Sequence, residues 1–177
     1  GYMWGTLGII YDANCSETIR EDVKSWDVFW DKNYKNLISI KNSMRDTFVV
    51  GLMHAYKNLA NKEDLSKNEV KFLEAVERAK TNDLTETIQN VFDLVINEED
   101  YASIIDVVKN EIISLKQNIF GFEVDSGKND IITGKIKMNL AWSGDAVYSI
   151  NEAYSSNEKE LYYTVPLEGS NIWYDAW

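Results

Sequence analysis

The spacing of apolar residues along the chain predicts strands that alternate with helices. Residues 2–11 are rich in aromatic and β-branched side chains, which is typical of a strand. Gly5 and Gly8 within this segment indicate a close approach of the backbone to another part of the chain, or a bend. Further strands are predicted from short apolar runs at residues 37–40, 120–124, 136–142 and 161–165.

Helices are predicted where apolar residues recur at every third or fourth position. The predicted helices are a short one after residue 25, one from residue 43 to about 60, three in a block at residues 66–116, and two at residues 126–134 and 146–154. The block begins with Ser66 and Glu69 at the spacing of a capping box, and its second helix begins at Thr85. The residues of its first helix expected to face inward are Val70, Leu73 and Val76.

Polar residues at two other helix starts have structural roles available to them. Ser43 and Asp46 also have capping-box spacing, and this role is as compatible with the sequence as a ligand-binding role. Ser143 is suited to cap the helix at residues 146–154, and Asp145 would be favoured by the dipole of its first turn.

Strands alternating with helices predict an α/β sandwich with a mostly parallel sheet. In such sheets ligands bind outside the carboxyl ends of the strands. The residues that fall there in this interpretation are Ser43, Asp46, Trp142, Asp145, Trp173 and Asp175.

Trp173 and Asp175 lie in an extended segment, residues 169–177, where alternation places both side chains on one face. A carboxylate supplies charge and acceptor oxygens for an ammonium, and an indole attracts the same cation through its ring face. This pair is therefore a candidate receptor for a cation with apolar methylenes. The alternative is that Trp173 is a core residue and Asp175 a surface residue.

Composition narrows the choice of ligand. The 177 residues include 29 acidic and 18 basic ones, a formal charge of −11, which disfavours nucleic acid and favours cations, although such charge also serves solubility. One cysteine and one histidine exclude an internal disulfide and leave little for a metal centre or a catalytic triad, so no metal or cofactor is expected. An enzyme using Asp145 and Asp175 for acid-base work is disfavoured, because no nucleophile or metal constellation accompanies them.

The chain contains no apolar run long enough for a membrane span and no signal-peptide pattern. Both of its ends resemble cuts through a longer protein. We therefore expect an excised domain.

Five motifs occur in an order that resembles the spermidine/putrescine-binding proteins of polyamine ABC transporters. They are residues 2–8 (YMWGTLG), 25–30 (SWDVFW), 42–46 (NSMRD), 141–146 (AWSGDA) and 166–175 (PLEGSNIWYD). The resemblance implies that residues 1–177 form one lobe of a two-lobed, type II periplasmic-binding-protein fold, with residues 66–116 as a helical insertion.

The resemblance also implies roles for the candidate residues. Trp142 and Trp173 would form walls of an aromatic box around a polyamine, and Asp175 would bind one of its amines. Asp46 falls where the family has a glutamate, and Asp145 matches members that bind putrescine.

Ser43 falls where some members of the family have an aspartate, so a charge is missing. A binding lobe for a different cationic or small solute therefore stays open as the alternative. The implied partners are the other lobe of the same protein and the ABC permease and ATPase. The implied location is outside the cytoplasm, with a lipoprotein tether or a fusion to the permease as the anchor. Because one lobe carries only part of the site, we expect the isolated chain to bind weakly.

Overall fold

The computed structural model describes residues 3–80, 98–157 and 159–175. The chain forms two compact units, one made of residues Gly1–Val50 and Ser114–Trp177, the other of residues Gly51–Ile113. The predicted helix that begins at Thr85 lies outside the described residues. Within the described residues, none of the helices combines the length and the apolar character needed to cross a membrane.

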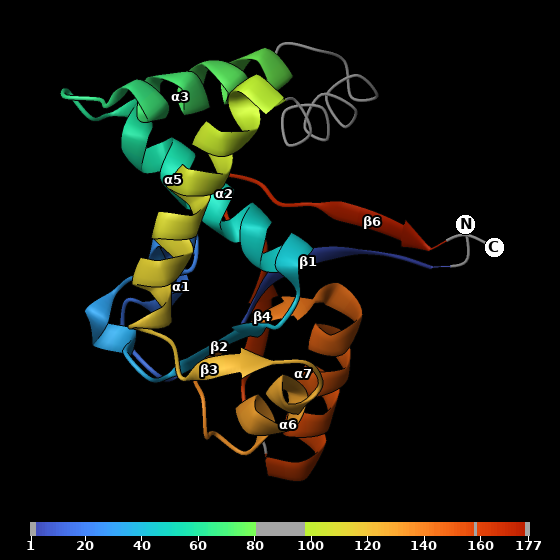
Figure 1. The fold of residues 1–177 in the computed structure, drawn as a ribbon. Coiled ribbons are helices and arrows are strands. Elements are labelled where there is room, and N and C mark those ends of the chain that lie inside the picture. The colour runs from blue at the N-terminus through green and yellow to red at the C-terminus, as the bar shows by residue number, and fades with distance from the viewer. Residues whose placement is uncertain (1–2, 81–97, 158, 176–177) are drawn as a thin grey trace. The chain divides into compact units, whose positions relative to one another are not determined.

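The first unit contains the sheet (Figure 1). The predicted strands and helices of this unit occur close to their predicted positions. The strands are β1 (Met3–Asp12), β2 (Ile38–Lys41), β3 (Gly121–Glu123), β4 (Met138–Trp142), β5 (Leu161–Thr164) and β6 (Ile172–Asp175). The helices are α1 (Ile19–Asp22), the 3-10 turns Trp26–Phe29 and Lys32–Tyr34, α6 (Ser126–Ile132) and α7 (Ser143–Asn157). Two longer helices, α2 (Met44–Ala60) and α5 (Glu98–Lys116), continue into the second unit.

The described strands form one mixed sheet in the order β3-β2-β4-β1-β5, with β6 paired to β1. β2 is parallel to β3 and β4, whereas β1 is antiparallel to β4, β5 and β6. Every strand except β1 therefore runs in the same direction. This arrangement confirms the predicted α/β fold, and the sheet is mixed because β1 runs against the other described strands.

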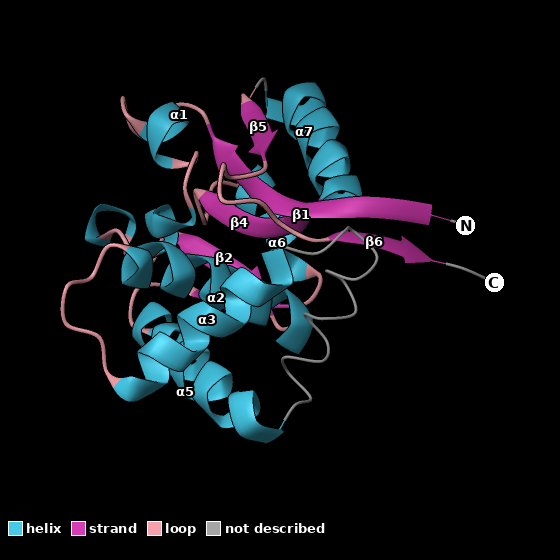
Figure 2. Cartoon of the chain, turned by 90° about the horizontal axis from the view of Figure 1, so that it is seen from above, coloured by secondary structure: helices cyan, strands magenta, loops and turns pink. Residues whose placement is uncertain are grey.

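The strand β1 is contacted closely by its neighbours, as its glycines predict. A Cβ atom on Gly8 would lie 2.5 Å from the carbonyl oxygen of Thr164 and 2.5 Å from the ring of Tyr163. Helices α6 and α7 pack against each other and against the sheet, as Figures 1 and 2 show. The buried cluster between them and the sheet consists of Ile10, Ile131, Ile132, Ile136, Ala141, Ala146, Ala153 and Leu161.

The second unit contains the later part of α2, the helix α3 (Lys67–Lys80) and most of α5. On α3 the fully buried side chains are Phe72 and Ala75, whereas Val70 is 39% exposed. The prediction that Val70 faces inward is therefore wrong, because the buried stripe of the helix is centred on Phe72 and Ala75. The only histidine, His54, is a buried residue of α2, and its Nδ1 atom lies 2.9 Å from Oε2 of Glu111 in α5.

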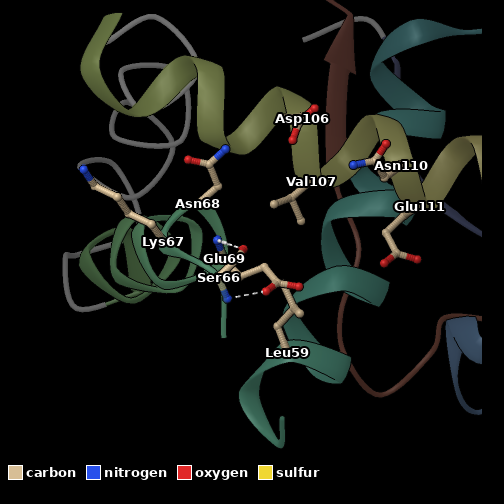
Figure 3. Close-up of a pocket in the computed structure, with 9 residues that line it drawn as sticks. All are labelled: Leu59, Ser66, Lys67, Asn68, Glu69, Asp106, Val107, Asn110 and Glu111. Atoms are coloured by element: carbon tan, nitrogen blue, oxygen red, sulfur yellow. Dashed lines mark hydrogen bonds between the residues drawn. The ribbon is translucent and has the colours of Figure 1, made fainter. Parts of the chain in front are cut away.

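The predicted capping box at the start of α3 is confirmed. The amide of Glu69 donates to the hydroxyl of Ser66, and the amide of Ser66 donates to the Glu69 carboxylate at 2.6 Å. Lys62 adds a 2.7 Å ion pair to the same carboxylate. These hydrogen bonds, that from Lys62 first, lower the pKa of Glu69 from 4.5 to about 2. Figure 3 shows the Ser66 and Glu69 pair at the edge of a pocket of about 390 Å³.

We expect Glu69→Gln to destabilise the chain by about 1 kcal/mol at neutral pH, because it removes a charged capping partner. A carboxylate with a lowered pKa in the folded state stabilises the fold above its unfolded pKa, and this contribution is lost as pH falls through the folded pKa. The difference in unfolding temperature between the wild type and Glu69→Gln should therefore be largest above about pH 4.5 and should decrease as the pH falls toward 2. Thermal unfolding followed by circular dichroism checks this.

The matched control is Glu74→Gln, which changes an exposed glutamate of the same helix. It is expected to change the unfolding temperature little. An equal, pH-independent loss in both variants would contradict the capping role of Glu69.

Candidate functional site

The register of the sheet places the two candidate tryptophans on one face. In the antiparallel ladders, Trp142 of β4 is opposite Leu7 of β1, and Trp173 of β6 is opposite Gly5. Directly opposite residues of an antiparallel pair share a face, and positions 5 and 7 of one strand also share a face. Trp142 and Trp173 therefore project from the same face. Asp175, two residues beyond Trp173 in the same strand, projects there as well.

The ring of Trp173 packs where Gly5 leaves room for it. A Cβ atom on Gly5 would lie 2.4 Å from Cζ2 of Trp173 and 2.9 Å from the hydroxyl of Ser143. That hydroxyl accepts a hydrogen bond from the backbone amide of Thr6 at 3.2 Å. The prediction that Ser143 caps a helix beginning near residue 146 is wrong, since α7 begins at Ser143 itself and its side chain binds β1.

The start of α2 is joined to the end of β4 by a buried carboxylate. The amide of Asp46 donates to the Ser43 hydroxyl at 3.4 Å, which is the serine half of the predicted capping box. The Asp46 carboxylate instead accepts a hydrogen bond from the indole nitrogen of Trp142 at 3.1 Å. Asp46 is 6% exposed, and among the described lysines, arginines and histidine none forms an ion pair with it. The site thus holds a buried negative charge with an aromatic neighbour.

Asp145 is in a different electrostatic environment. One carboxylate oxygen, Oδ2, lies 3.4 Å from the ammonium of Lys41, and the other, Oδ1, lies 3.3 Å from that of Lys128. Both lysines belong to this chain, so the charge of Asp145 is neutralised within the protein. The structure therefore assigns Asp145 an internal ion pair that the sequence pattern did not indicate.

Lys41 is a residue of this region that sequence reasoning missed. It is the last residue of β2 and 1% exposed, and its ammonium lies 2.9 Å from the Glu123 carboxylate and 4.6 Å from the ring centre of Trp142. The available signal was its position, because a lysine directly after three buried strand residues stands at the carboxyl end of the sheet. Sequence reasoning also missed Glu123, which has the same positional signal because it is the last residue of β3.

Contacts that are direct or pass through Lys41 link four of the six candidates, and the other two, Trp173 and Asp175, share a face of the sheet with Trp142. Hydrogen bonds join Ser43 to Asp46 and Asp46 to Trp142. The Lys41 ammonium contacts both the Asp145 carboxylate and the Trp142 ring. The Trp173 ring lies beside Ser143, which follows Trp142 in the chain. Asp175 shares the face of the tryptophans but is exposed. The described residues contain no cluster of histidine, cysteine or acidic side chains arranged to hold a metal ion. The pocket beside Glu69 contains none of the candidates.

Comparison with known proteins supports the resemblance. No family model matches the chain. The chain is 23% identical over 179 aligned residues to the putrescine/agmatine-binding protein of Pseudomonas aeruginosa. The alignment covers 97% of this chain but 39% of that protein, so the chain spans well under half the length of its curated relative.

Solved structures agree with this result. The spermidine/putrescine ABC transporter substrate-binding protein of Streptococcus pneumoniae matches with a TM-score of 0.58 and 24% identity, over 97% of this chain and 39% of that one. A putative spermidine/putrescine ABC transporter from Listeria monocytogenes has the same TM-score at 21% identity and the same coverage. The chain therefore shares its fold with a part of these proteins. A Treponema pallidum lipoprotein of 14% identity shares this fold at a TM-score of 0.53, over 97% of this chain and 40% of that one.

The contact between Gly5 and Trp173 yields a test. Gly5→Ala places a methyl group on the Trp173 ring, so we expect the ring to move and stability to fall by about 1–3 kcal/mol, as in other overpacked sites. The indole proton resonance of Trp173 reports the movement. Gly144→Ala is the matched control, because a Cβ there meets no atom within 4 Å. An unchanged Trp173 resonance in Gly5→Ala would contradict the described packing.

Proposed function

We propose that this chain binds a polyamine, spermidine or putrescine, as one lobe of a hinged solute-binding protein that serves ABC-transporter uptake. The observation that carries the proposal is the buried carboxylate of Asp46, which is bonded to the Trp142 indole and has no ion-pair partner among the described side chains. A buried charge is costly unless it is paired. A ligand ammonium at this position supplies the missing partner.

The neighbouring side chains fit the remainder of a polyamine. Trp142 and Trp173 project from one face at partner positions two residues apart on β1, which is about 7 Å along a strand. Indole faces cover methylenes and attract ammonium groups, at roughly 0.5–2 kcal/mol for each contact. Asp175 lies beyond Trp173 as a second carboxylate, and each ammonium-carboxylate hydrogen bond contributes roughly 1.5–3 kcal/mol.

Further parts of the proposal rest on the similarity to polyamine-binding proteins. We infer that residues 1–177 are one lobe, that residues 66–116 are an insertion in it, and that a second lobe closes over the ligand. The binding protein is located outside the cytoplasm, where it passes its ligand to the membrane permease that works with the ATPase. The similar proteins are named for ligand binding and ABC transport, and we assign this chain no catalytic role.

A second candidate is a binding lobe for a different small cationic solute. Two observations favour it: Ser43 adds no charge beside Asp46, and Asp145 is already paired with Lys41 and Lys128. Because a relative is named as binding agmatine, agmatine is the first such ligand to compare with the polyamines. Tighter binding of agmatine than of both putrescine and spermidine would select this candidate.

The test is a nuclear magnetic resonance titration of the chain with putrescine and spermidine that follows the indole protons. We expect weak, saturable shifts of Trp142 and Trp173 that persist at moderate salt, because buried charge pairs are screened less than exposed ones. Asp46→Asn keeps an acceptor for the Trp142 indole but removes the charge. It should weaken binding about tenfold or more, and Asp175→Asn should weaken binding by a smaller factor.

Asp64→Asn is the control, since it removes one exposed negative charge from the second unit. It should leave the affinity nearly unchanged. If only scattered acidic surface residues respond, and salt abolishes the response, net charge explains the binding and the proposal fails. Submicromolar affinity of the chain alone would contradict the view that it carries part of a two-lobed site.

A further inference from the structure

Lys41 already occupies a receptor for an ammonium group. Its nitrogen lies 2.9 Å from Glu123, 3.4 Å from Asp145 and 3.1 Å from the carbonyl oxygen of Val124, and 4.6 Å from the ring centre of Trp142. Two carboxylates, a carbonyl and an indole face are the partners that would recognise the end of a polyamine. In this chain they hold the protein's own ammonium.

We propose that Lys41 determines specificity by filling this ammonium position, so that the site accepts a diamine in preference to a triamine. The inference rests on the proposed function. Lys41 and Lys128 supply two positive charges, which balance the negative charges of Glu123 and Asp145. The carboxylates left for a ligand are Asp46 and Asp175, which match two ammonium groups. A third ammonium of the ligand would meet the Lys41 charge instead of a free Asp145.

The position of Lys41 is held rigidly. Its side chain is 1% exposed, and its partner Glu123 accepts hydrogen bonds from the amide of Gly127 at 2.9 Å and from the side-chain amide of Asn139 at 3.1 Å. A Cβ atom on Gly127 would lie 2.5 Å from the Asn139 amide nitrogen and 2.7 Å from the Glu123 carboxylate. Because these groups pack so closely, Lys41 cannot swing away to release Asp145 without breaking the network.

The experiment compares putrescine with spermidine in the double variant Lys41→Met, Glu123→Gln. Changing both residues avoids a buried, unpaired Glu123, which would strongly destabilise the chain. We expect the ratio of spermidine affinity to putrescine affinity to rise about tenfold, because a third ligand ammonium no longer meets the Lys41 charge and the Asp145 oxygen released by Lys41 can accept from it, while Lys128 stays on the other oxygen.

The matched control is the double variant Lys135→Met, Asp130→Asn. It also removes a lysine that lies near an aromatic ring, 5.0 Å from the centre of Phe120, together with its carboxylate partner at 3.0 Å. Lys135 precedes β4, whereas Trp142 ends that strand. The affinity ratio should stay at the wild-type value in this control.

A single variant covers the case in which the double variant does not fold. If Lys41 and Lys128 satisfy Asp145, then Asp145→Asn should change putrescine affinity by less than about twofold, while Asp46→Asn weakens it about tenfold. An equal loss in both variants would place a ligand ammonium at Asp145 and overturn the inference.

The outcomes separate this inference from the proposed function. If the wild type binds polyamines at Trp142 and Trp173 but the ratio is the same in both double variants, the role of Lys41 is wrong and the proposed function stands. If no variant shows saturable shifts of these indoles with either amine, the proposed function fails, and the role of Lys41 fails with it.

Discussion

The candidate site depends on the pairing of one strand, β1. This ten-residue strand runs against the direction of the others and pairs with β4, β5 and β6. Gly5 and Leu7 of this strand pair with Trp173 and Trp142, respectively. The spacing of the two indoles therefore follows from the two-residue repeat of a strand rather than from flexible loops. The absence of a side chain at Gly5 lets the Trp173 ring lie over the strand. A shift in register by one residue would turn the tryptophans away from each other.

Two buried charge systems at the carboxyl ends of β2 and β4 differ in how they are compensated. Lys41 is surrounded by acceptors, and its pair with Glu123 is closed within the protein. Asp46, in the first turn of α2, has an indole donor but no cation among the described residues. A closed pair stabilises a particular arrangement, whereas an uncompensated carboxylate attracts a cation from outside. Both systems touch Trp142, so this indole links the structural charge pair to the proposed ligand position.

Local sequence patterns predicted much of the fold, because strands and helices follow from the period of apolar residues and from caps such as Ser66 and Glu69. The shared face of Trp173 and Asp175 was likewise predicted from alternation within one strand. The partners of Trp142 were not, because a residue's neighbours across a sheet depend on register, which no local pattern contains. Lys41 appeared to be an ordinary residue at a strand end, and only the assembled sheet brings Glu123 and Asp145 to it. Val70 shows the same limit on a helix, since the centre of a buried stripe depends on what packs against it.

The two carboxylates proposed to bind the ligand differ in their exposure to water, and this difference bears on the need for a second lobe. Asp46 is 6% exposed, so an ammonium beside it is weakly screened and its contribution is large. Asp175 is exposed on β6, where a charge pair in water contributes little. A surface that covers the ligand removes this water and strengthens both the Asp175 pair and the cation contacts of Trp173. Under the proposed function, closure is thus the step that would make the outer half of the site effective, and the chain alone would hold its ligand mainly through Asp46 and Trp142.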